Sequence, residues 1–296
     1  MLTDKQLEAR KKYIGGADCA AVLGLSRYAT PLSVWADKLN KLPKEDISKK
    51  LYIKMGNRLE EVVAELFTEE TGKAVRRVNE TFYHPKYPFL AANIDRRVVG
   101  EDAILECKTA GGWMAKDWVD NEVPIEYLLQ CLHYLAVTGK KEAYIAVLIG
   151  GNQDFIWKKV ERDEKLISDI VKKEVAFWNN FVLTGEMPVQ ITKDDADTLY
   201  GLYPLEQEGK TIELDDKANI LCESLQAMNQ DKKVLEGNIE RTKNEIKALL
   251  KDNEGGKSDL WKVTWKKQKK ESYTVAASTS RVLRTKSLLK KEGKNQ

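Results

Sequence analysis

Apolar residues recur at helical spacing in several segments of the N-terminal two thirds of the chain. The clearest predicted helix lies between Gly56-Asn57 and Gly72, where apolar positions follow the i, i+3, i+4, i+7 pattern. Its apolar stripe consists of Leu59, Val62, Val63, Leu66 and Phe67. Further helices are predicted at 16–23, 31–39, 124–138 and 164–184, with start signals at Thr30, Pro124 and Asp163.

Alternating and continuous apolar runs predict strands between these helices. Short strands are expected at 81–83, 89–95, 97–99 and 103–108. The apolar run 143–149 predicts a central strand, and Gly150-Gly151-Asn152 predicts a hairpin into 154–160. This order of elements predicts an α/β domain over residues 1–205: first helices, then a strand meander, a helix, a hairpin and a last helix.

A different pattern follows in residues 206–296, which we interpret as an accessory region. Its 3/4-spaced apolar positions are Ala218, Leu221, Leu225, Met228, Leu235, Ile239, Ile246 and Leu249. Lys232 and Thr242 interrupt this seam and Gly237 lies inside it, so the pattern predicts either a long helix or a helical hairpin that needs a partner surface. Trp261, Val263 and Trp265 alternate with basic or polar residues and predict a short strand.

Composition excludes several classes of protein. The 296 residues are 42% hydrophobic and 32% charged, which is enough apolar material for a packed core and excludes a disordered chain. No apolar run approaches the roughly 18 residues of a membrane-spanning helix, and the N-terminus lacks the apolar segment of a secretory signal. Four widely spaced cysteines argue against a disulfide framework and a cysteine-based zinc site, so we expect a reducing cytosol.

Charge is distributed unevenly along the chain. Residues 257–296 hold 12 Lys and Arg against 3 Asp and Glu, whereas the whole chain has a net charge of only +3. A basic tail on an acidic body is typical of proteins that bind nucleic acid, because cations displace counterions from phosphates. A solubilising tail has the same composition, so both interpretations stay open.

Candidate chemistry is concentrated around the predicted strand 103–108. Glu106 and Lys108 share one face of it, because side chains two residues apart point the same way in a strand. Asp95 lies one short hairpin away, where it can pair beside Glu106. Two close carboxylates form a hard oxygen site for Mg²⁺, and the lysine can stabilise negative charge or orient a water molecule. A structural salt bridge between Glu106 and Lys108 is the alternative.

Two predicted helices offer further candidates. At about 100° per residue from Leu59, Glu60 falls at the edge of the apolar stripe and Glu61 falls on the solvent side. Glu60 can therefore complete a three-carboxylate site, or serve simply as an acid near a helix start. Gln130 and Tyr134 share a face of an otherwise apolar helix.

Several enzyme classes lack their motifs in this chain. With only two histidines, His84 and His133, a Ser-His-Asp hydrolase, a metalloprotease and a histidine-based zinc site are disfavoured. No GxxxxGK[ST] occurs, and no GxGxxG follows a strand, so ATPase and dinucleotide-binding functions have no support.

The order G-x-x-x-E, D, E-x-K and Q-x-x-x-Y resembles the PD-(D/E)XK nuclease superfamily and, more narrowly, the YqaJ-like phage recombinases related to lambda exonuclease. The matching motifs are Gly56-Asn57-Arg58-Leu59-Glu60, Ala92-Asn93-Ile94-Asp95, Leu105-Glu106-Cys107-Lys108-Thr109 and Gln130-Cys131-Leu132-His133-Tyr134. The opening Ile14–Asp18, Leu23–Ser26 and Thr30-Pro31 is similar to that family's first signature. The resemblance covers residues 10–185, and Ile94 stands where the family has proline.

The resemblance implies a restriction-endonuclease-like α/β core, with a mixed central sheet flanked by helices, and an Mg²⁺-dependent 5′→3′ double-strand DNA exonuclease. Asp95, Glu106 and the Cys107 carbonyl would then ligate two Mg²⁺ ions, for which Mn²⁺ can substitute, and Glu60 would join directly or through water. Lys108 would position or activate the attacking water, and Gln130 would hold that lysine or the scissile phosphate.

We expect DNA contacts from Gly16, Ser26, Arg27, Trp35, Arg58 and Tyr134. Gly15-Gly16 before a helix can expose backbone N–H groups to a 5′ phosphate, although a plain tight turn is an equal alternative. Trp35 and Trp113 can stack on bases, but tryptophan at helical spacing is more often core. The resemblance also implies a single-strand annealing partner, a trimeric ring around DNA, and a phage or prophage protein in the bacterial cytoplasm, away from membranes.

Two rival functions remain at this point. One is a site-specific or structure-specific endonuclease on the same core. The other is a non-catalytic DNA-binding or assembly protein, held together through the Ala218–Leu249 helix, in which Asp95, Glu106 and Lys108 form only a structural salt-bridge cluster.

Overall fold

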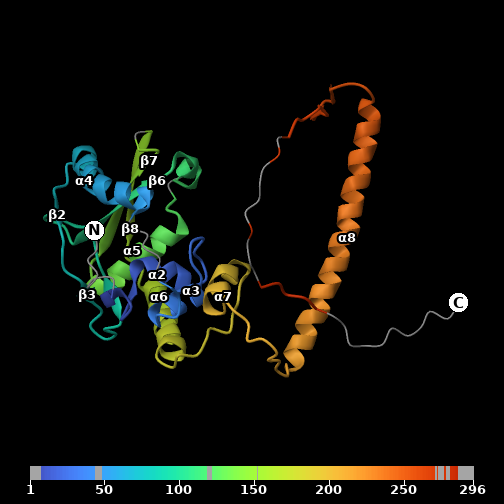
Figure 1. Ribbon diagram of the computed structural model, residues 1–296. Coiled ribbons are helices and arrows are strands. Elements are labelled where there is room, and N and C mark those ends of the chain that lie inside the picture. Colours follow the sequence, from blue (N-terminus) through green and yellow to red (C-terminus); the bar gives the residue numbers. More distant parts are fainter. Residues whose placement is uncertain are drawn as a thin grey trace. The chain divides into compact units, whose positions relative to one another are not determined.

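The computed structural model describes residues 8–43, 49–118, 122–151, 153–270, 272, 277 and 281–285 (Figure 1). The chain divides into two units, Met1–Pro204 and Leu205–Gln296. Much of the basic tail lies outside the described residues.

A mixed sheet with the strand order β2-β5-β6-β7-β8 forms the centre of the first unit. Its strands are β2 (Val75–Arg77), β5 (Arg96–Val98), β6 (Ala103–Ala110), β7 (Glu142–Ile149) and β8 (Asp154–Glu161). β6 and β7 run parallel, and all other neighbours run antiparallel. A parallel pair needs a crossover connection, and α5 provides it between β6 and β7.

The other elements of the first unit surround this sheet. A second sheet has the order β1-β4-β3, with β1 (Ile14–Gly15), β4 (Leu90–Ala92) and β3 (Phe82–Tyr83). The α-helices are α2 (Gly16–Val22), α3 (Pro31–Lys38), α4 (Leu51–Thr71), α5 (Ile125–Thr138), α6 (Glu164–Phe177) and α7 (Ala196–Leu202). Short 3₁₀ segments are η2 (Gly112–Trp118) and η4 (Lys193–Asp195), and η3 (Trp178–Val182) is π-helical.

Alternate residues of the central strands enter two cores, one on each face of the sheet. Ile104 and Ile145 join a core formed with α2, α3, α5 and α6, whereas Leu105 and Tyr144 join a smaller core beneath Phe67 of α4. Figure 1 shows α4 on one side of the strands and α2, α5 and α6 on the other. Each fully buried apolar side chain contributes about 1.5–3 kcal/mol. The period-2 alternation of β6 therefore decides which of its residues face α5.

Most predicted elements of this unit are present, with instructive differences at their ends. Thr30 caps α3 by accepting a hydrogen bond from Ser33 N–H, and Gly72 ends α4 with a left-handed φ of 69°. α4, however, begins at Leu51 rather than after Gly56-Asn57, because a single glycine inside a helix costs only about 1 kcal/mol. The helix predicted to reach residue 184 ends its α-helical part at Phe177 and continues as the π-helical turn η3.

The second unit is built around one long helix. α8 runs without a break from Asp216 to Leu250, so the helical hairpin considered for this segment is absent and Gly237 lies within the helix. After α8, β9 (Gly255–Lys257) and β10 (Lys262–Thr264) form an antiparallel pair, which contains the middle of the predicted Trp261–Trp265 strand. Within the described residues, no helix combines the length and apolar character that crossing a bilayer requires.

Candidate active site

Asp95 and Glu106 are brought together by the register of β5 and β6. Arg96 pairs with Leu105 in the antiparallel ladder, so the preceding Asp95 lies opposite the following Glu106. Asp95 Oδ2 accepts a hydrogen bond from the Cys107 N–H at 2.8 Å. In an extended strand the N–H and C=O of one residue point to the same edge, so the Cys107 carbonyl also points toward the Asp95 side. Sequence periodicity predicted this juxtaposition.

Glu106 and Lys108 lie on the face of β6 that carries Ile104, which is the face covered by α5. The Lys108 ammonium donates a hydrogen bond to Glu106 Oε1 at 2.7 Å. From α5, the Gln130 amide donates to the same oxygen at 2.6 Å and to the Tyr134 hydroxyl at 2.9 Å. The predicted pair of strand residues and pair of helix residues thus form one hydrogen-bonded cluster.

The second carboxylate oxygen of Glu106 is free for a ligand. Glu106 is only 4% exposed, and within the described residues its Oε2 is buried without a hydrogen-bond partner. A buried carboxylate oxygen in this state costs free energy unless something binds it. The Asp95 carboxylate, Glu106 Oε2 and the Cys107 carbonyl are all hard oxygen donors, which suit Mg²⁺ or Mn²⁺. The residues present therefore fit the divalent cation that the family resemblance implies.

Burial and like charge act together on this cluster. Burial raises the pKa of Asp95 well above its ordinary value, and the neighbouring Glu106 carboxylate raises it further. Burial lowers the pKa of Lys108, but the Glu106 carboxylate outweighs this effect and holds that pKa above its usual range. A carboxyl group whose pKa is raised by burial and by a neighbouring carboxylate is typical of functional sites, where like charges are brought together in the interior.

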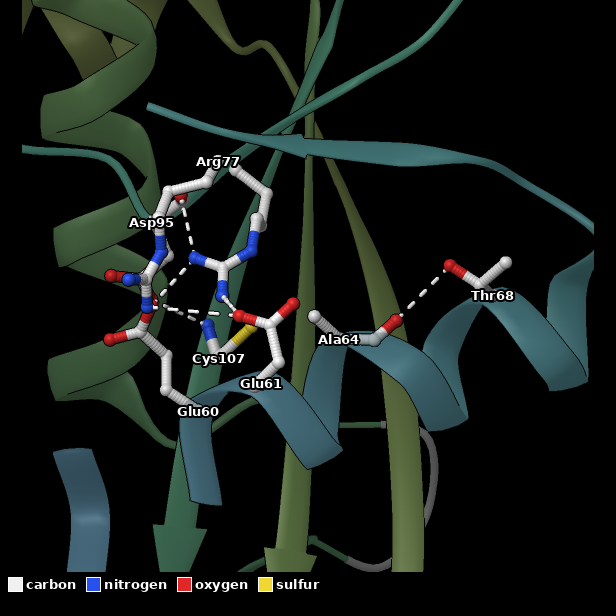
Figure 2. Close-up of polar contacts among 8 residues, drawn as sticks. Glu60, Glu61, Ala64, Thr68, Arg77, Asp95 and Cys107 are labelled. Carbon is white, nitrogen blue, oxygen red and sulfur yellow. Dashed lines mark hydrogen bonds and ion pairs between the residues drawn. The ribbon is translucent and has the colours of Figure 1, made fainter. Parts of the chain in front are cut away.

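Glu60 reaches the edge of this cluster from α4, but two arginines bind it. Its Oε1 accepts hydrogen bonds from Arg96 Nη1 at 2.6 Å and Arg77 Nη2 at 2.9 Å. Figure 2 shows Glu60 and Glu61 pointing from α4 toward Arg77 and Asp95. Glu60 also contributes to the raised pKa of Asp95, so it lies within electrostatic reach of that carboxylate. Its helix position matches the prediction, whereas its arginine partners were not foreseen.

Arg96 is the site residue that sequence reasoning missed. It is only 2% exposed, and it donates to Glu60 Oε1, to Glu61 Oε2 at 2.9 Å and to the Asp95 carbonyl at 2.9 Å. A buried guanidinium needs such partners, because an unpaired charge in the interior is costly. The signal was present in the sequence: Arg96 lies two residues before the apolar Val98, so the two share the buried face of β5.

Of the two alternatives for Gly15-Gly16, the structure favours the plain turn over the anion site. The Gly15 N–H already donates to Asp18 Oδ2 at 2.9 Å, so a carboxylate of the chain occupies the place of an anion. A Cβ on Gly16 would lie 2.4 Å from Cε1 of Tyr134 and 2.9 Å from Cγ of Gln130. Gly16 is therefore required for close packing of α2 on α5. Tyr134 is correspondingly buried, so it holds Gln130 instead of contacting DNA.

The other predicted DNA contacts have mixed outcomes. Trp35 is 3% exposed and its indole N–H donates to the Phe181 carbonyl, so it is a core residue that cannot stack on a base. Arg27 forms ion pairs of 2.7 Å with both Asp117 and Glu126, which neutralise it.

Ser26 Oγ accepts the backbone N–H groups of Tyr28 and Ala29 and so stabilises a turn. Arg58 on α4 and Trp113 on η2 are exposed, so both side chains are accessible to a ligand.

A second polar cluster lies behind Gln130 and Tyr134, in the core. Cys19, His133 and Glu174 are fully buried, and their potential ligand atoms lie within 4.8 Å of one another. His133 Nδ1 is 2.8 Å from Glu174 Oε1, and its Nε2 is 3.0 Å from the Ala91 carbonyl. Burial lowers the pKa of His133, but Glu174 outweighs burial and raises it. Glu174 and the Ala91 carbonyl both offer acceptor oxygens to the ring nitrogens, which favours a protonated His133 paired with the Glu174 carboxylate.

Comparison with known sequences identifies the family. Residues 5–141 match the YqaJ-like viral recombinase domain. The chain is 39% identical over 270 residues to the uncharacterized protein YqaJ of Bacillus subtilis (strain 168), and the match covers 90% of this chain and 84% of that protein. The chain therefore belongs to the YqaJ-like viral recombinase family, which confirms the resemblance noted in the sequence.

Comparison with solved structures identifies the fold. The alkaline exonuclease LHK-Exo from Laribacter hongkongensis matches with a TM-score of 0.51 and 20% identity over 60% of this chain and 92% of that chain. The same exonuclease in complex with dAMP matches with a TM-score of 0.52, at the same identity and coverage. The mixed sheet flanked by helices is thus a PD-(D/E)XK core, as predicted.

Proposed function

We propose that this protein is an Mg²⁺-dependent 5′→3′ exonuclease of double-stranded DNA that acts in a phage recombination system. The observation that carries the proposal is the carboxylate pair Asp95–Glu106, with one buried oxygen of Glu106 left without a partner and Lys108 hydrogen-bonded to the other. Two adjacent buried carboxylates repel each other unless a cation or a proton lies between them, and the neighbouring Glu106 carboxylate raises the pKa of Asp95 beyond the effect of burial. Membership of a recombinase family and a fold shared with an exonuclease support the same conclusion.

Each residue of the cluster has a distinct role in this proposal. Asp95, Glu106 and the Cys107 carbonyl would hold one or two cations, and Glu60 would join them from α4 through water or directly. Bound Mg²⁺ supplies water activation and neutralises charge on the phosphate and on the leaving 3′ oxygen. The Lys108 ammonium orients the attacking water. Gln130 fixes Glu106 from α5, and it is itself held by Tyr134.

The proposed substrates are duplex DNA ends, and the products are 5′ nucleotides and a growing 3′ single strand. A single-strand annealing protein would load on that strand in the cytoplasm of a bacterial host. We further propose that several copies assemble around DNA, which makes digestion processive. Arg58 and Trp113 are exposed candidates for DNA contact in the first unit.

The decisive experiment is digestion of a linear duplex that carries a 5′ phosphate on one end only. We expect Mg²⁺-dependent loss of the 5′-phosphorylated strand, survival of the other strand, and no loss in EDTA. The absence of digestion in both Mg²⁺ and Mn²⁺ would favour the non-catalytic DNA-binding protein. Covalently closed plasmid is the matched control: an exonuclease leaves it intact until it is linearised, whereas cleavage of the closed circle would identify an endonuclease.

A further inference from the structure

Arg96 binds Glu60, Glu61 and Asp95 with one guanidinium. Its Nη1 donates to Glu60 Oε1 at 2.6 Å and to the Asp95 carbonyl at 2.9 Å, and its Nη2 donates to Glu61 Oε2 at 2.9 Å. The planar fork of arginine suits this arrangement, because its donors have fixed directions. Arg96 is only 2% exposed, so the interior of the first unit fixes its position.

Arg77 binds the same oxygen of Glu60 from the neighbouring strand. Arg77 of β2 and Arg96 of β5 lie directly opposite each other in the antiparallel register, where like charges repel. Both nevertheless donate to Glu60 Oε1, Arg77 at a distance of 2.9 Å. Because both arginines use Oε1, Oε2 is the oxygen that Glu60 can offer to a cation.

A purely structural role explains the contacts of Arg96 poorly. The apolar face of α4 already attaches this helix to the sheet, because Val63, Ala64 and Phe67 are buried in the core that they share with β6 and β7. The ion pair with Glu61 adds little to stability, since the Glu61 side chain is 61% exposed. Burying the Arg96 guanidinium itself costs free energy. Its contacts are therefore better explained by the side chain that they hold in place.

The carboxylate that Arg96 holds lies beside the Asp95–Glu106 cluster. The Glu60 side chain extends from α4 toward Asp95 (Figure 2). Burial and the Glu106 carboxylate raise the pKa of Asp95, and the charge of Glu60 adds to that rise. Because these carboxylates repel one another, an unrestrained Glu60, which is already 25% exposed, would turn to solvent. The Arg96 guanidinium supplies the opposite charge that keeps Glu60 at the cluster.

We propose that Arg96 is a positioning residue of the cation site and holds Glu60 where this carboxylate can join Asp95 and Glu106 around a divalent cation. The inference rests on the proposed function, because it assumes the cation that the nuclease would bind. Arg96 does not ligate the cation and acts through Glu60, as hydrogen-bond donors behind metal-binding carboxylates commonly do. Loss of such a donor typically weakens metal binding by about 10–100-fold.

The test is binding of Mn²⁺ to the full-length protein without DNA, followed through the electron paramagnetic resonance signal of free Mn²⁺. We expect Arg96→Met to weaken Mn²⁺ binding at the cluster by about tenfold. Glu106→Gln identifies the binding that belongs to the cluster, because it removes a ligand. Arg97→Met is the matched control and should leave the affinity unchanged. Arg97 is the next residue of β5, has the same charge, and is exposed 3.5 Å from Glu80.

A double variant shows whether Arg96 acts through Glu60. Glu60→Ala alone should weaken Mn²⁺ binding. Adding Arg96→Met to Glu60→Ala should cause no further loss, because the carboxylate that Arg96 holds is then absent. Arg96→Lys should also weaken binding, since a point charge cannot replace the fork, and it carries the test if Arg96→Met does not fold. Urea unfolding of each variant measures its stability separately from its Mn²⁺ affinity.

Three results would overturn the proposal and leave the proposed function in place. Equal Mn²⁺ affinity at lower stability in Arg96→Met would make Arg96 a structural clamp between α4 and β5. Higher affinity in that variant would mean that Arg96 competes with the cation for Glu60. Additive losses in the double variant would mean that Arg96 does not act through Glu60. If the natural protein binds no Mn²⁺ at the cluster, the proposal and the proposed function are both wrong.

Discussion

The two units use the same apolar periodicity in opposite ways. In the first unit the apolar stripe of α4 enters a core, with Val63 and Phe67 fully buried against β6 and β7. In the second unit the stripe of α8 stays exposed along its length. Periodicity therefore predicts a helix equally well in both places, but it does not say whether the covering surface belongs to the same chain. A strictly alternating 3/4 spacing, as in α8, indicates a second helix, whereas the wider stripe of α4 indicates a sheet.

The largest expected effect belongs to the first unit. Lys108→Ala should reduce turnover by about 10²–10⁴-fold, because it removes the positioned ammonium beside Glu106. The measurement is single-turnover digestion of linear duplex, with urea denaturation of the same variant. Under the proposed function the variant stays folded. If the natural protein does not cut DNA and Lys108→Ala loses several kcal/mol of stability, the cluster is only a structural salt bridge.

A second substitution distinguishes packing from ligand binding at α2. Gly16→Ala should destabilise the first unit by about 1–3 kcal/mol and lower turnover, because its Cβ would overlap Tyr134, which holds Gln130. Gly15→Ala is the neighbouring control, since its Cβ would meet Tyr13 at an ordinary 3.6 Å. Both variants are followed by thermal unfolding and by binding to 5′-phosphorylated ends. If Gly15→Ala binds 5′-phosphorylated ends more weakly at unchanged stability, the Gly15 N–H binds the end phosphate in solution, although Asp18 occupies that place in this structure.

The second unit is tested through its basic tail. Deleting residues 257–296 should weaken DNA binding about tenfold and flatten its dependence on salt, because fewer phosphate counterions are released. A shorter deletion of 286–296 removes four lysines and one glutamate and should have a smaller effect of the same kind. The measurement is fluorescence anisotropy of a duplex at several salt concentrations. Equal affinity and equal salt slope for all three proteins would show that the tail only solubilises the chain.

The smallest expected effect is on stability against pH. His133 faces Glu174 of α6, Cys19 and Asp18 of α2, and His84, and its pKa is raised in the folded state. Its contribution to stability is therefore complete below the unfolded pKa of about 6.5 and is lost as pH rises through the higher folded pKa. The slope is at most about 1.4 kcal/mol per pH unit. Urea unfolding of His133→Gln at a series of pH values should lack this decline.

His84 provides a control of opposite sign for that experiment. Burial and the charge of His133 lower the pKa of His84, so its contribution is present above the unfolded pKa and is lost as pH falls. His84→Gln should therefore leave the decline above neutral pH in place. If His133→Gln and the natural sequence lose stability in parallel as pH rises, the imidazolium–carboxylate pair does not exist in solution.

Sequence reasoning located the residues of the candidate site that depend on local geometry. Glu106 and Lys108 share a face because strand periodicity is exact over three residues, and Asp95 arrives beside them through a short hairpin. Gln130 was visible as a lone amide on an apolar helix. The partners of these residues across the fold were not visible. Packing between elements distant in sequence decides that Arg77 binds Glu60 and that Gly16 contacts Tyr134.

Two of the predicted DNA contacts are occupied by partners within the chain, one of them local and one distant in sequence. Gly15-Gly16 has the composition of an anion cradle, yet the carboxylate that occupies it comes from Asp18, three residues later. The sequence around Arg27 indicates an exposed side chain, but it cannot show the ion pair with Glu126, which lies 99 residues away in sequence. In the second unit the sequence left one long helix and a helical hairpin open, and the long helix is present because one glycine costs too little to break a helix of this length.

The His133–Glu174 pair affects the order in which the first unit folds during synthesis. Glu174 follows His133 by 41 residues, so the sequence of α5 is made before that of α6. Until α6 has been made and has packed against α5, the buried histidine lacks the counter-charge of Glu174. The buried ion pair therefore forms only when the first unit is nearly complete.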